Sequence, residues 1–535
     1  MEDPQDPSTL ISGDASIRKT KAVKLPKEVV NLSNNRLKEH ITSASIKFYH
    51  DEPKDLQVQA VSALVQGENY FLRAGTGYGK TRISEMYYML FKSKVVVLVL
   101  NPLDSLGNDQ LVKIRVINLT KMTLNPGIIK KVKKGHYAFV YLSPEVLLNS
   151  SLFAEMFFSP EFQNILGLIV IDKAHMIFLW GLVASRQSKN MSVFTRHEDR
   201  AVFRIAYGNI GTRLMSTNHV PVLMLSATCR PIAVDSIIKN LMLQPWEVTM
   251  LNGELTRPEI QFIQVQMKST LKSCDDLLRV FAPHTIVPAN KTVPTIIYSG
   301  TRNATFQVMK VVNEAHLTRK HEYDPVDGFI RRYHSCTGDE DKEANMADYA
   351  DAKFPIMSST MALGLGQNLK RVRCVIHMGR GDPASIAQMV GRCGRDGKPG
   401  LALFFMEATP VGGTCIRVSF AMDSKNGYVP LSVDDPNYRL EQARELHVGL
   451  PPCDCSICMP LHAQAILRAL PQGDEDHLDA LLKDPFSFVI DESIKTLVRK
   501  RKSQRVKGTC KYPTVMAANL SAYLVQCFVE FFDRN

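Results

Sequence analysis

The chain has 535 residues, which is enough for two or three domains, each with its own hydrophobic core. Its hydrophobic content of 45% and charged content of 22% are typical of globular proteins and exclude a fibrous or fully disordered chain. The formal net charge of +12 favours a polyanionic partner, either nucleic acid or an anionic membrane surface, although solubility alone explains it equally well. No segment is continuously apolar over the length of a membrane span.

The 11 cysteines are an odd number and are scattered, except for one cluster between residues 453 and 458. No secretory signal is recognised at the N-terminus. Cysteines in this pattern are typical of proteins in reducing compartments. We therefore expect an intracellular protein with reduced thiols.

In chain order, residues 1–45 are polar without sustained periodicity and are expected to form a flexible tail. Apolar spacing after Lys54 predicts a helix that carries Gln57. Two sets of short apolar runs then alternate with helical segments, as in parallel sheets covered by helices on both faces. The first set is 95–100, 139–142, 168–171 and 222–225, and the second is 295–298, 356–358, 374–377 and 401–406. This alternation predicts two tandem α/β lobes with a boundary near residues 256–258.

Residues 71–81, FLRAGTGYGKT, have the pattern of a phosphate-binding loop between a strand and a helix. Glycines allow the backbone N–H groups to surround phosphate, and the helix dipole adds positive charge. Lys80 is expected to reach the β- and γ-phosphates, and the Thr81 hydroxyl to bind Mg²⁺. Ala74 replaces the first glycine of the usual pattern, so the loop needs support from the rest of the chain. The expected nucleotide contacts are Gly75, Thr76, Gly77, Gly79, Lys80 and Thr81.

Two further segments carry charged groups suited to phosphoryl transfer. In LIVIDKAH, Asp172 ends a buried strand, where its carboxylate can hold Mg²⁺ beside the phosphate loop. In QMVGRCGRDG (388–397), Arg392 and Arg395 are three residues apart, so on a helix they would share a face, and the flanking glycines favour a fixed backbone path over a solvated helix. Guanidinium groups aimed across a cleft would stabilise charge developing on a γ-phosphate. A basic surface turn is the alternative interpretation of this segment.

Together these motifs resemble those of the superfamily 2 helicases and, within them, the RecQ DNA helicases. The resemblance spans about residues 48–406 and continues more weakly to Cys458. The matching segments are 74–81, 101–110 (NPLDSLGNDQ), 141–145 (YLSPE), 171–175 (IDKAH), Trp180-Gly181, 226–228 (SAT), 296–302 (IIYSGTR), 333–340 (YHSCTGDE), 359–373 (STMALGLGQNLKRVR) and 388–397.

The resemblance implies two RecA-like lobes, ATP and Mg²⁺ in the cleft between them, and 3′–5′ unwinding of DNA. It implies single-stranded and forked duplex DNA as partners, a nuclear location with the cytoplasm as alternative, and roles in DNA repair and recombination. Gln57 matches the residue that reads adenine in the family. The implied catalytic residues are Lys80, Asp172, His175, Arg392 and Arg395, with Thr81 and Asp172 as Mg²⁺ ligands.

Three departures bear on activity. RecQ proteins have Glu where this chain has Lys173, and a charged lysine cannot take a proton from the attacking water. Lys173 could also neutralise Asp172 and compete with Mg²⁺. The family's aromatic-rich coupling loop reads LVASR at residues 182–186, and Leu369-Lys370 replaces the usual Lys-Pro. We therefore expect ATP binding with slow hydrolysis and weak or absent unwinding. The alternative is a catalytically impaired pseudo-helicase that binds ATP and DNA and serves assembly or regulation.

The cluster PPCDCSIC contains Cys453, Cys455 and Cys458, where RecQ proteins carry a four-cysteine zinc site. Tyr438 stands where the first cysteine of that site is expected, and His447 or Cys415 could supply the fourth ligand. Three reduced thiols in a degenerate subdomain are the alternative.

The expected domains are a tail over 1–45, an ATP-binding lobe over 46–258, a second lobe over 259–408, a zinc-type subdomain over 409–465 and a basic helical segment over 466–535. In the last segment, RKRK at 499–502 is interpreted as a nuclear-import signal or a DNA contact, with a solvated basic face as alternative. Residues 520–532 predict an amphipathic helix. Protein partners and oligomeric state have no sequence signal.

Overall fold

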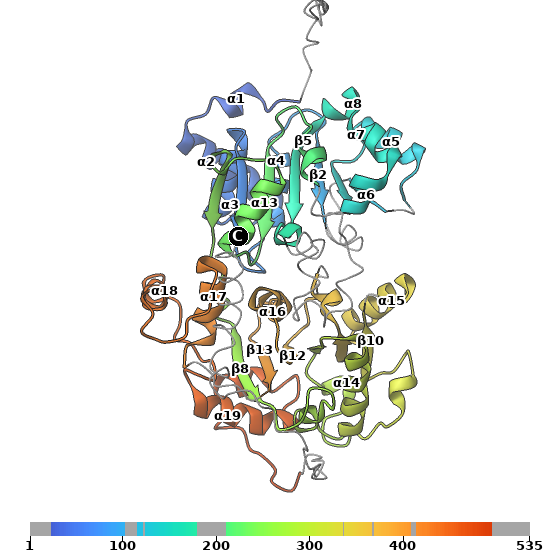
Figure 1. The fold of residues 1–535 in the computed structure, drawn as a ribbon, viewed down its shortest axis with the longest axis vertical. Coiled ribbons are helices and arrows are strands. Elements are labelled where there is room, and N and C mark those ends of the chain that lie inside the picture. The colour runs from blue at the N-terminus through green and yellow to red at the C-terminus, as the bar shows by residue number, and fades with distance from the viewer. Residues whose placement is uncertain are drawn as a thin grey trace, which may run out of the picture.

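The computed structural model describes residues 23–101, 115–120, 123–178, 210–334, 336–365, 369–407 and 413–494. These residues form two α/β lobes that lie one above the other along the long axis of the molecule (Figure 1). Each lobe contains one parallel sheet flanked by helices, and a helical region follows the second lobe. The expected fold of two tandem RecA-like lobes is confirmed.

The first sheet has seven parallel strands in the order β3-β4-β2-β5-β6-β1-β7. Its strands are β1 (Asn69–Arg73), β2 (Val96–Leu100), β3 (Val116–Leu119), β4 (Phe139–Leu142), β5 (Leu166–Asp172), β6 (Val222–Ser226) and β7 (Val248–Asn252). Strands β2, β4 and β6 are buried at every position, as expected for strands covered on both faces. The edge strands β3 and β7 are partly exposed and were not predicted from the sequence.

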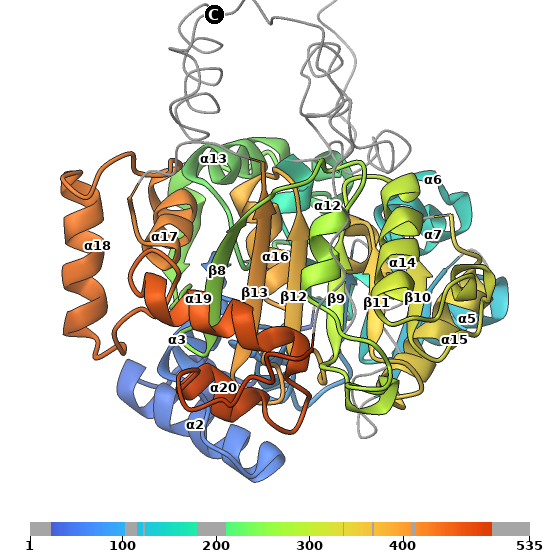
Figure 2. The same ribbon diagram turned by 90° about the horizontal axis from the view of Figure 1, so that it is seen from below.

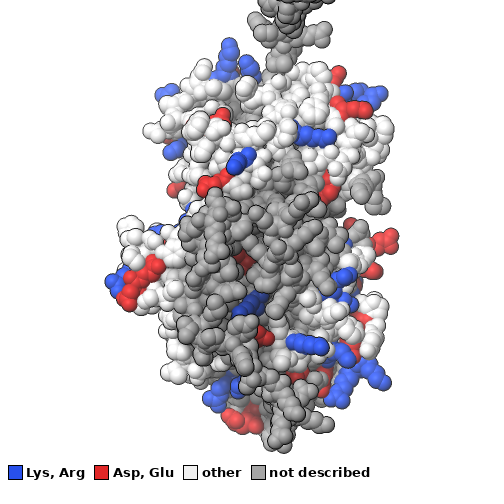
Figure 3. All heavy atoms as spheres, in the orientation of Figure 1, with Lys and Arg blue, Asp and Glu red and all other residues white. Residues whose placement is uncertain are grey.

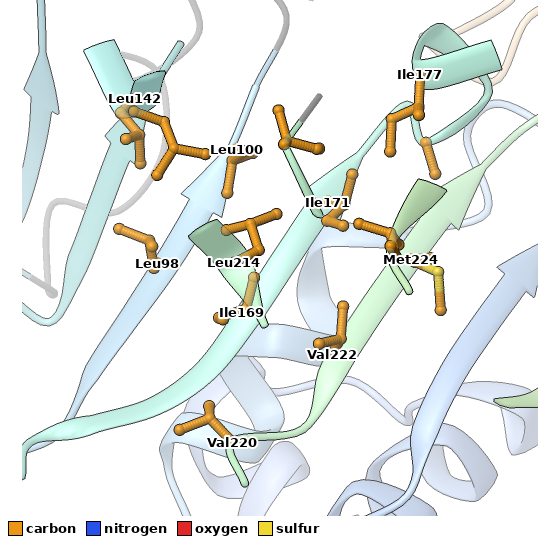
Figure 4. Packing of buried hydrophobic residues seen from close by; sticks show 14 of the residues in the cluster. Leu98, Leu100, Leu142, Ile169, Ile171, Ile177, Leu214, Val220, Val222 and Met224 are labelled. Carbon is orange, nitrogen blue, oxygen red and sulfur yellow. The ribbon is translucent and has the colours of Figure 1, made fainter. Parts of the chain in front are cut away.

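The core on one face of this sheet is built from alternate residues of neighbouring strands (Figure 4). Leu98 and Leu100 of β2, Ile169 and Ile171 of β5, and Val222 and Met224 of β6 belong to this cluster. Asp172 is the last residue of β5 and therefore lies at the carboxyl end of the sheet. It follows the core residue Ile171, so by the two-residue period its side chain is on the opposite face from that core.

The second sheet has six parallel strands in the order β10-β11-β9-β12-β13-β8. Its strands are β8 (Ile260–Gln266), β9 (Thr295–Tyr298), β10 (Ile330–Tyr333), β11 (Ile356–Ser359), β12 (Cys374–Met378) and β13 (Gly400–Met406). The four predicted runs correspond to β9, β11, β12 and β13, whereas the edge strands β8 and β10 were missed.

The helices of the first lobe are α1 (Lys27–Val30), α2 (Asn34–Tyr49), α3 (Asp55–Val65), α4 (Thr81–Tyr88), α5 (Pro126–Lys133), α6 (Pro144–Asn149), α7 (Ser151–Phe157), α8 (Pro160–Gln163), α12 (Gly211–Leu214) and α13 (Pro231–Asn240). The helices that follow are α14 (Arg302–Ala315), α15 (Asp339–Ala350), α16 (Pro383–Val390), α17 (Ile416–Asn426), α18 (Pro436–His447), α19 (Pro460–Ala469) and α20 (Leu478–Lys483). No helix of the described ranges combines the length and the apolar character needed to cross a bilayer.

Helix α2 corrects the later part of the flexible tail expected over residues 1–45, because it is helical and packs on the first lobe. Residues 1–22 lie outside the described residues. Its buried residues Leu37, Ile41 and Ser45 are spaced by four, and the first two join the core that α3 also lines. A stripe of two apolar residues and one serine is too narrow for the periodicity of the sequence to reveal it.

The boundary expected at residues 465 and 466 is also wrong, because it falls inside α19. Ile466 of α19 and Leu478 and Leu482 of α20 are buried in the core of the second lobe. Helices α17 and α18 lie together at one side of the molecule in both ribbon views (Figures 1 and 2). The expected basic segment at 499–502 and the helix at 520–532 lie outside the described residues.

Charges of both signs are interspersed on the molecular face shown in Figure 3. Among the described residues on that face, Lys and Arg side chains do not gather into one large patch of a single sign. The net charge therefore does not by itself mark a binding surface there.

Candidate nucleotide site between the lobes

The phosphate loop, residues 74–80, connects β1 to α4 and is held by the helix before it. Gly77 and Gly79 have φ values of 79° and 84°, which residues with a Cβ atom rarely adopt. The Gln57 amide of α3 donates to the Gly79 carbonyl at 3.0 Å, and its Oε1 accepts from the Lys54 N–H at 2.9 Å. A Cβ atom on residue 79 would lie 2.8 Å from the Gln57 amide nitrogen. The structure thus places Gln57, which the resemblance matches to the adenine-reading residue, against the phosphate loop.

The Lys80 side chain forms hydrogen bonds with the backbone of its own loop. Its Nζ donates to the carbonyl oxygens of Ala74 at 2.8 Å and Gly75 at 2.9 Å. Burial lowers the pKa of Lys80 to about 7, although the nearby Asp172 carboxylate opposes this shift. Thr81 follows as the first residue of α4. A buried cation that bonds only neutral carbonyl groups is suited to receive an anion.

Asp172 and Lys173 form an ion pair at the carboxyl end of β5. The Lys173 Nζ donates to the Asp172 Oδ2 at 2.8 Å, and both side chains are largely buried. Burial favours the neutral form of Asp172, but the ammonium groups of Lys173 and Lys80 outweigh it and hold its pKa below the usual range. Burial lowers the pKa of Lys173, while Asp172 opposes that shift.

This ion pair bears on the Mg²⁺ that the RecQ resemblance implies. Thr81 and Asp172 offer the oxygen donors that Mg²⁺ prefers. However, the Asp172 oxygen already accepts from an ammonium group, and a divalent cation at that carboxylate would lie beside a fixed positive charge. In this arrangement the donor set does not fit Mg²⁺.

His175 joins the two lobes. The Gln388 amide of α16 donates to the His175 Nε2 at 2.7 Å, so the His175 Nδ1 carries the proton and donates to the Ser226 Oγ at 2.8 Å. The Gln388 amide also approaches the Thr228 Oγ1 at 3.3 Å, and Thr228 donates to the Ala384 carbonyl at 3.2 Å. Burial lowers the pKa of His175 to about 4, and the adjacent Lys173 adds to this effect, so the ring is neutral at physiological pH.

Arg392 and Arg395 lie beside the same site, in turns rather than on a helix. Helix α16 ends at Val390, and both arginines lie in the turns that follow it. Burial lowers the pKa of both guanidinium groups, and their charges lower the pKa of Lys173, which places them near its ammonium group. The Arg395 Nε donates to the Gly391 carbonyl at 3.2 Å. A glycine-bounded turn, and not a helical face, therefore carries both guanidinium groups.

Arg257 is a further cation at this site that sequence reasoning missed. Its guanidinium donates to the Thr76 Oγ1 at 3.0 Å and to the Cys393 carbonyl at 3.0 Å, so it links the phosphate loop to the second lobe. The lobes approach so closely here that a Cβ atom on Gly391 would lie 2.3 Å from the Thr76 Oγ1. The only sequence signal for Arg257 is its position at the expected boundary between the lobes.

A small cavity of about 60 Å³ lies beside this junction. Its lining includes Gly75, Thr76, Thr228, Arg257, Gly391 and Arg417, which come from both lobes and the following helical region.

A second junction, here called the clasp, consists of Arg230, Asp382 and Asp423. Arg230 precedes α13 of the first lobe, Asp382 precedes α16 of the second, and Asp423 lies in α17. The Arg230 Nη2 lies 2.9 Å from the Asp382 Oδ1 and 2.7 Å from the Asp423 Oδ1. Burial raises the pKa of Asp423 to about 6 despite the Arg230 charge, so this carboxylate is ionised at neutral pH and depends on Arg230.

The cysteine cluster has a fourth member. The Sγ atoms of Cys415, Cys453, Cys455 and Cys458 all lie within 4.8 Å of one another. Of the two substitutes that the sequence suggests, the structure brings in Cys415 rather than His447. Tyr438 also lies at the cluster, where its hydroxyl accepts from the Cys415 N–H at 3.1 Å.

These thiols fit zinc. Thiolate ligands at about 2.3 Å in a tetrahedron have sulfur atoms about 3.8 Å apart. The four residues would hold the ion and tie the start of α17 to the segment before α19. A closed four-thiolate site of this kind stabilises structure and has no open position for catalysis.

Several expected motif residues cannot be placed. The segment after Asn101, Trp180-Gly181, the 182–186 loop and residues 366–368 lie outside the described residues.

Comparison with known families supports this architecture. The DEAD/DEAH box helicase family matches residues 54–236, and the helicase conserved C-terminal domain matches residues 272–397. The bifunctional 3′-5′ exonuclease/ATP-dependent helicase WRN of Mus musculus is 27% identical over 361 residues, which cover 65% of this chain and 23% of that protein. The ATP-dependent DNA helicase RecQ of Haemophilus influenzae is 25% identical over 362 residues, or 66% of this chain and 50% of that protein.

Among solved structures, the DUF1998 helicase MrfA bound to DNA and AMPPNP aligns with a TM-score of 0.50 at 16% identity, over 87% of this chain and 61% of that chain. At that identity the likeness concerns the fold alone. The chain spans half or less of the length of the WRN and RecQ relatives. With both helicase domains in order on two RecA-like sheets, the chain is a superfamily 2 protein of the DEAD/DEAH box helicase type, distantly similar to the RecQ helicases.

Proposed function

We propose that the protein is a RecQ-type, ATP-dependent 3′–5′ DNA helicase with slow ATP turnover. The observation that carries this proposal is the hydrogen bond between Gln388 of the second lobe and His175 of the first, beside the phosphate loop. A contact that joins the lobes at the nucleotide site allows nucleotide binding to control their relative position.

Each residue has a role that its position supports. Lys80 binds the β- and γ-phosphates in place of the two carbonyl groups that it now contacts. Gln57 reads adenine, and its anchoring to the loop keeps it beside the bound nucleotide. Arg392 and Arg395 contribute positive charge from the second lobe toward the γ-phosphate. His175 stays neutral and transmits the state of the site to Ser226 and Thr228.

Slow turnover follows from Lys173. Its ammonium group pairs with Asp172 and cannot deprotonate an attacking water. The loss of one such catalytic group typically lowers a rate by about 10²–10⁴.

The Asp172–Lys173 pair also favours a second candidate function, an ATP- and DNA-binding protein that does not unwind. The two candidates differ only in whether the remaining turnover moves DNA.

DNA is the proposed nucleic acid because the similar RecQ protein is named a DNA helicase. The net charge of +12 is consistent with backbone contacts, whose affinity falls with salt as counterions are released. A nuclear location, with the cytoplasm as alternative, is proposed with this function.

The test is ATP hydrolysis and unwinding of a forked duplex by the full chain. We expect weak DNA-stimulated hydrolysis, a gain of at least about tenfold in Lys173→Glu and little gain in Lys173→Gln. Robust hydrolysis by the unmodified protein would contradict slow turnover, and hydrolysis without unwinding would favour the second candidate.

Nucleic-acid binding is tested across a salt series with single-stranded DNA and RNA of one sequence. We expect a linear fall of log affinity with log salt and tighter binding of DNA. A flat plot would contradict backbone binding, and a preference for RNA would contradict the choice of DNA.

A further inference from the structure

Positive charge dominates the environment of Lys80. The charged groups that act most strongly on it are one carboxylate, Asp172, and three cations, Lys173, Arg257 and Arg395. Asp172 is already shared, because its Oδ2 accepts from Lys173 at 2.8 Å, and the Arg257 charge is offset by its pair with Glu259, which leaves Lys80, Lys173 and Arg395 with one carboxylate between them. The site therefore carries excess positive charge before any metal enters.

The identity of residue 173 accounts for the size of this excess. The RecQ resemblance places a glutamate there, so lysine changes the local charge by about +2, which equals the charge of one Mg²⁺. A nucleoside triphosphate carries about four negative charges alone and about two when one Mg²⁺ is bound. The substitution thus matches the site to the metal-free nucleotide in charge.

The geometry at Lys173 also suits binding of a metal-free nucleotide. An ammonium group has three N–H donors, and the structure shows one of them directed at Asp172. The backbone at Lys173 has a φ of 56°, and the Ala174 N–H donates to the Leu225 carbonyl at 2.8 Å, which fixes the turn that carries the side chain. The cation is therefore held at the sheet edge beside the phosphate loop, where the donor set does not fit Mg²⁺.

We propose that this site binds nucleoside triphosphate without a divalent metal, with the Lys173 ammonium group supplying the charge that Mg²⁺ supplies elsewhere in the family. The inference rests on the proposed function, because it assumes that nucleotide binds at Lys80. It makes nucleotide binding independent of Mg²⁺ concentration.

The experiment measures binding of a fluorescent ATP analogue to the full chain in excess Mg²⁺ and in excess EDTA. We expect the Kd of the unmodified protein to differ by less than about threefold between the two conditions. Lys173→Glu should bind at least about tenfold more weakly in EDTA than in Mg²⁺, because two carboxylates would then face the phosphates.

Two controls make the result specific. Lys173→Gln keeps a side chain of similar length without charge and should lose metal-free affinity by about tenfold or more, since one favourable charge is removed. Lys80→Ala should lose binding in both conditions. Thermal unfolding of each variant checks that it is folded.

Each outcome has one meaning. If the unmodified protein binds at least tenfold more weakly in EDTA, the inference is overturned and the nucleotide site stands. Metal-free binding by Lys173→Gln that equals the unmodified protein would also overturn it, because the ammonium group would be dispensable. Absence of binding in both conditions would instead overturn the proposed function.

Discussion

The two junctions between the lobes have opposite electrostatics. In the clasp, one guanidinium group, Arg230, lies between two carboxylates, Asp382 and Asp423. At the nucleotide site, Lys80 donates hydrogen bonds only to carbonyl oxygens. The one carboxylate that acts strongly on it, Asp172, is already paired with Lys173. In the clasp the buried cation already has anionic partners within the protein, whereas the cations of the nucleotide site gain enough negative charge only when an anion binds.

This difference predicts that the clasp stabilises the folded protein, whereas the nucleotide site is built for binding at some expense of stability. A paired buried charge that loses its partner costs several kcal/mol, so the clasp should hold the lobes together. A buried excess charge lowers the stability of the protein without ligand, as functional sites commonly do. Substitutions in the two junctions should therefore change stability in opposite directions.

The largest effect is expected from Arg230→Ala in the clasp. Because this change leaves the buried Asp423 carboxylate without its guanidinium partner, it should lower the free energy of unfolding by about 3–5 kcal/mol. Urea unfolding at neutral pH measures it. Arg439→Ala, which removes the exposed pair with Asp434, is the matched control and should cost less than about 1 kcal/mol. Equal losses in both variants would show that the clasp is not a stabilising junction.

A smaller effect is expected from the titration of His175. Its pKa is lowered from 6.5 to about 4 in the folded protein, so it contributes stability that is present above pH 6.5 and is lost as the pH falls toward 4. The shift corresponds to about 3 kcal/mol. Unfolding of the unmodified protein and of His175→Gln should diverge over this range, with the exposed His136→Gln as control. Parallel pH curves for the unmodified protein and His175→Gln would contradict a buried neutral imidazole.

The smallest effect, opposite in sign, is expected from Lys80→Met. The pKa of Lys80 is lowered from 10.5 to about 7, so its contribution to stability is present above pH 10.5 and is lost as the pH falls through 7. Near pH 7 and below, removal of the buried charge should raise the free energy of unfolding by only about 1 kcal/mol, because loss of the two hydrogen bonds to the Ala74 and Gly75 carbonyl groups offsets most of the relief, while nucleotide binding is abolished. Lys92→Met, at an exposed pair with Glu28, is the control and should leave stability almost unchanged. A clear loss of stability in Lys80→Met would remove the contrast between the junctions.

Features that depend on residues close together in the sequence could be predicted from it. Runs such as 139–142 and 295–298 are uniformly apolar because both faces of the strand are covered, and they match β4 and β9. The phosphate loop and the strand-end Asp172 follow in the same way, because glycine spacing and strand ends are local signals. Edge strands β3 and β7 lack this signal, since part of each strand faces solvent.

Contacts between distant segments could not be predicted. The clasp joins Arg230 to Asp423 over 193 positions, and neither residue lies in a motif. The fourth cysteine is a similar case, because Cys415 reaches Cys455 across 40 positions and only the fold selects it over the nearer His447. The turn after α16 could not be told from a helical face by spacing alone, because three-residue spacing suits both conformations.

Helix α2 has a consequence for how the protein can be produced and trimmed. The family matches begin at residue 54 and end at residue 397, but the folded body begins before them and continues beyond them. A fragment cut to the matched range would lose α2 and α17–α20 and would expose the apolar surfaces that Leu37, Ile41 and Ile466 cover. Newly exposed apolar surface promotes aggregation. Recombinant fragments intended for crystals or assays should therefore retain at least residues 27–483.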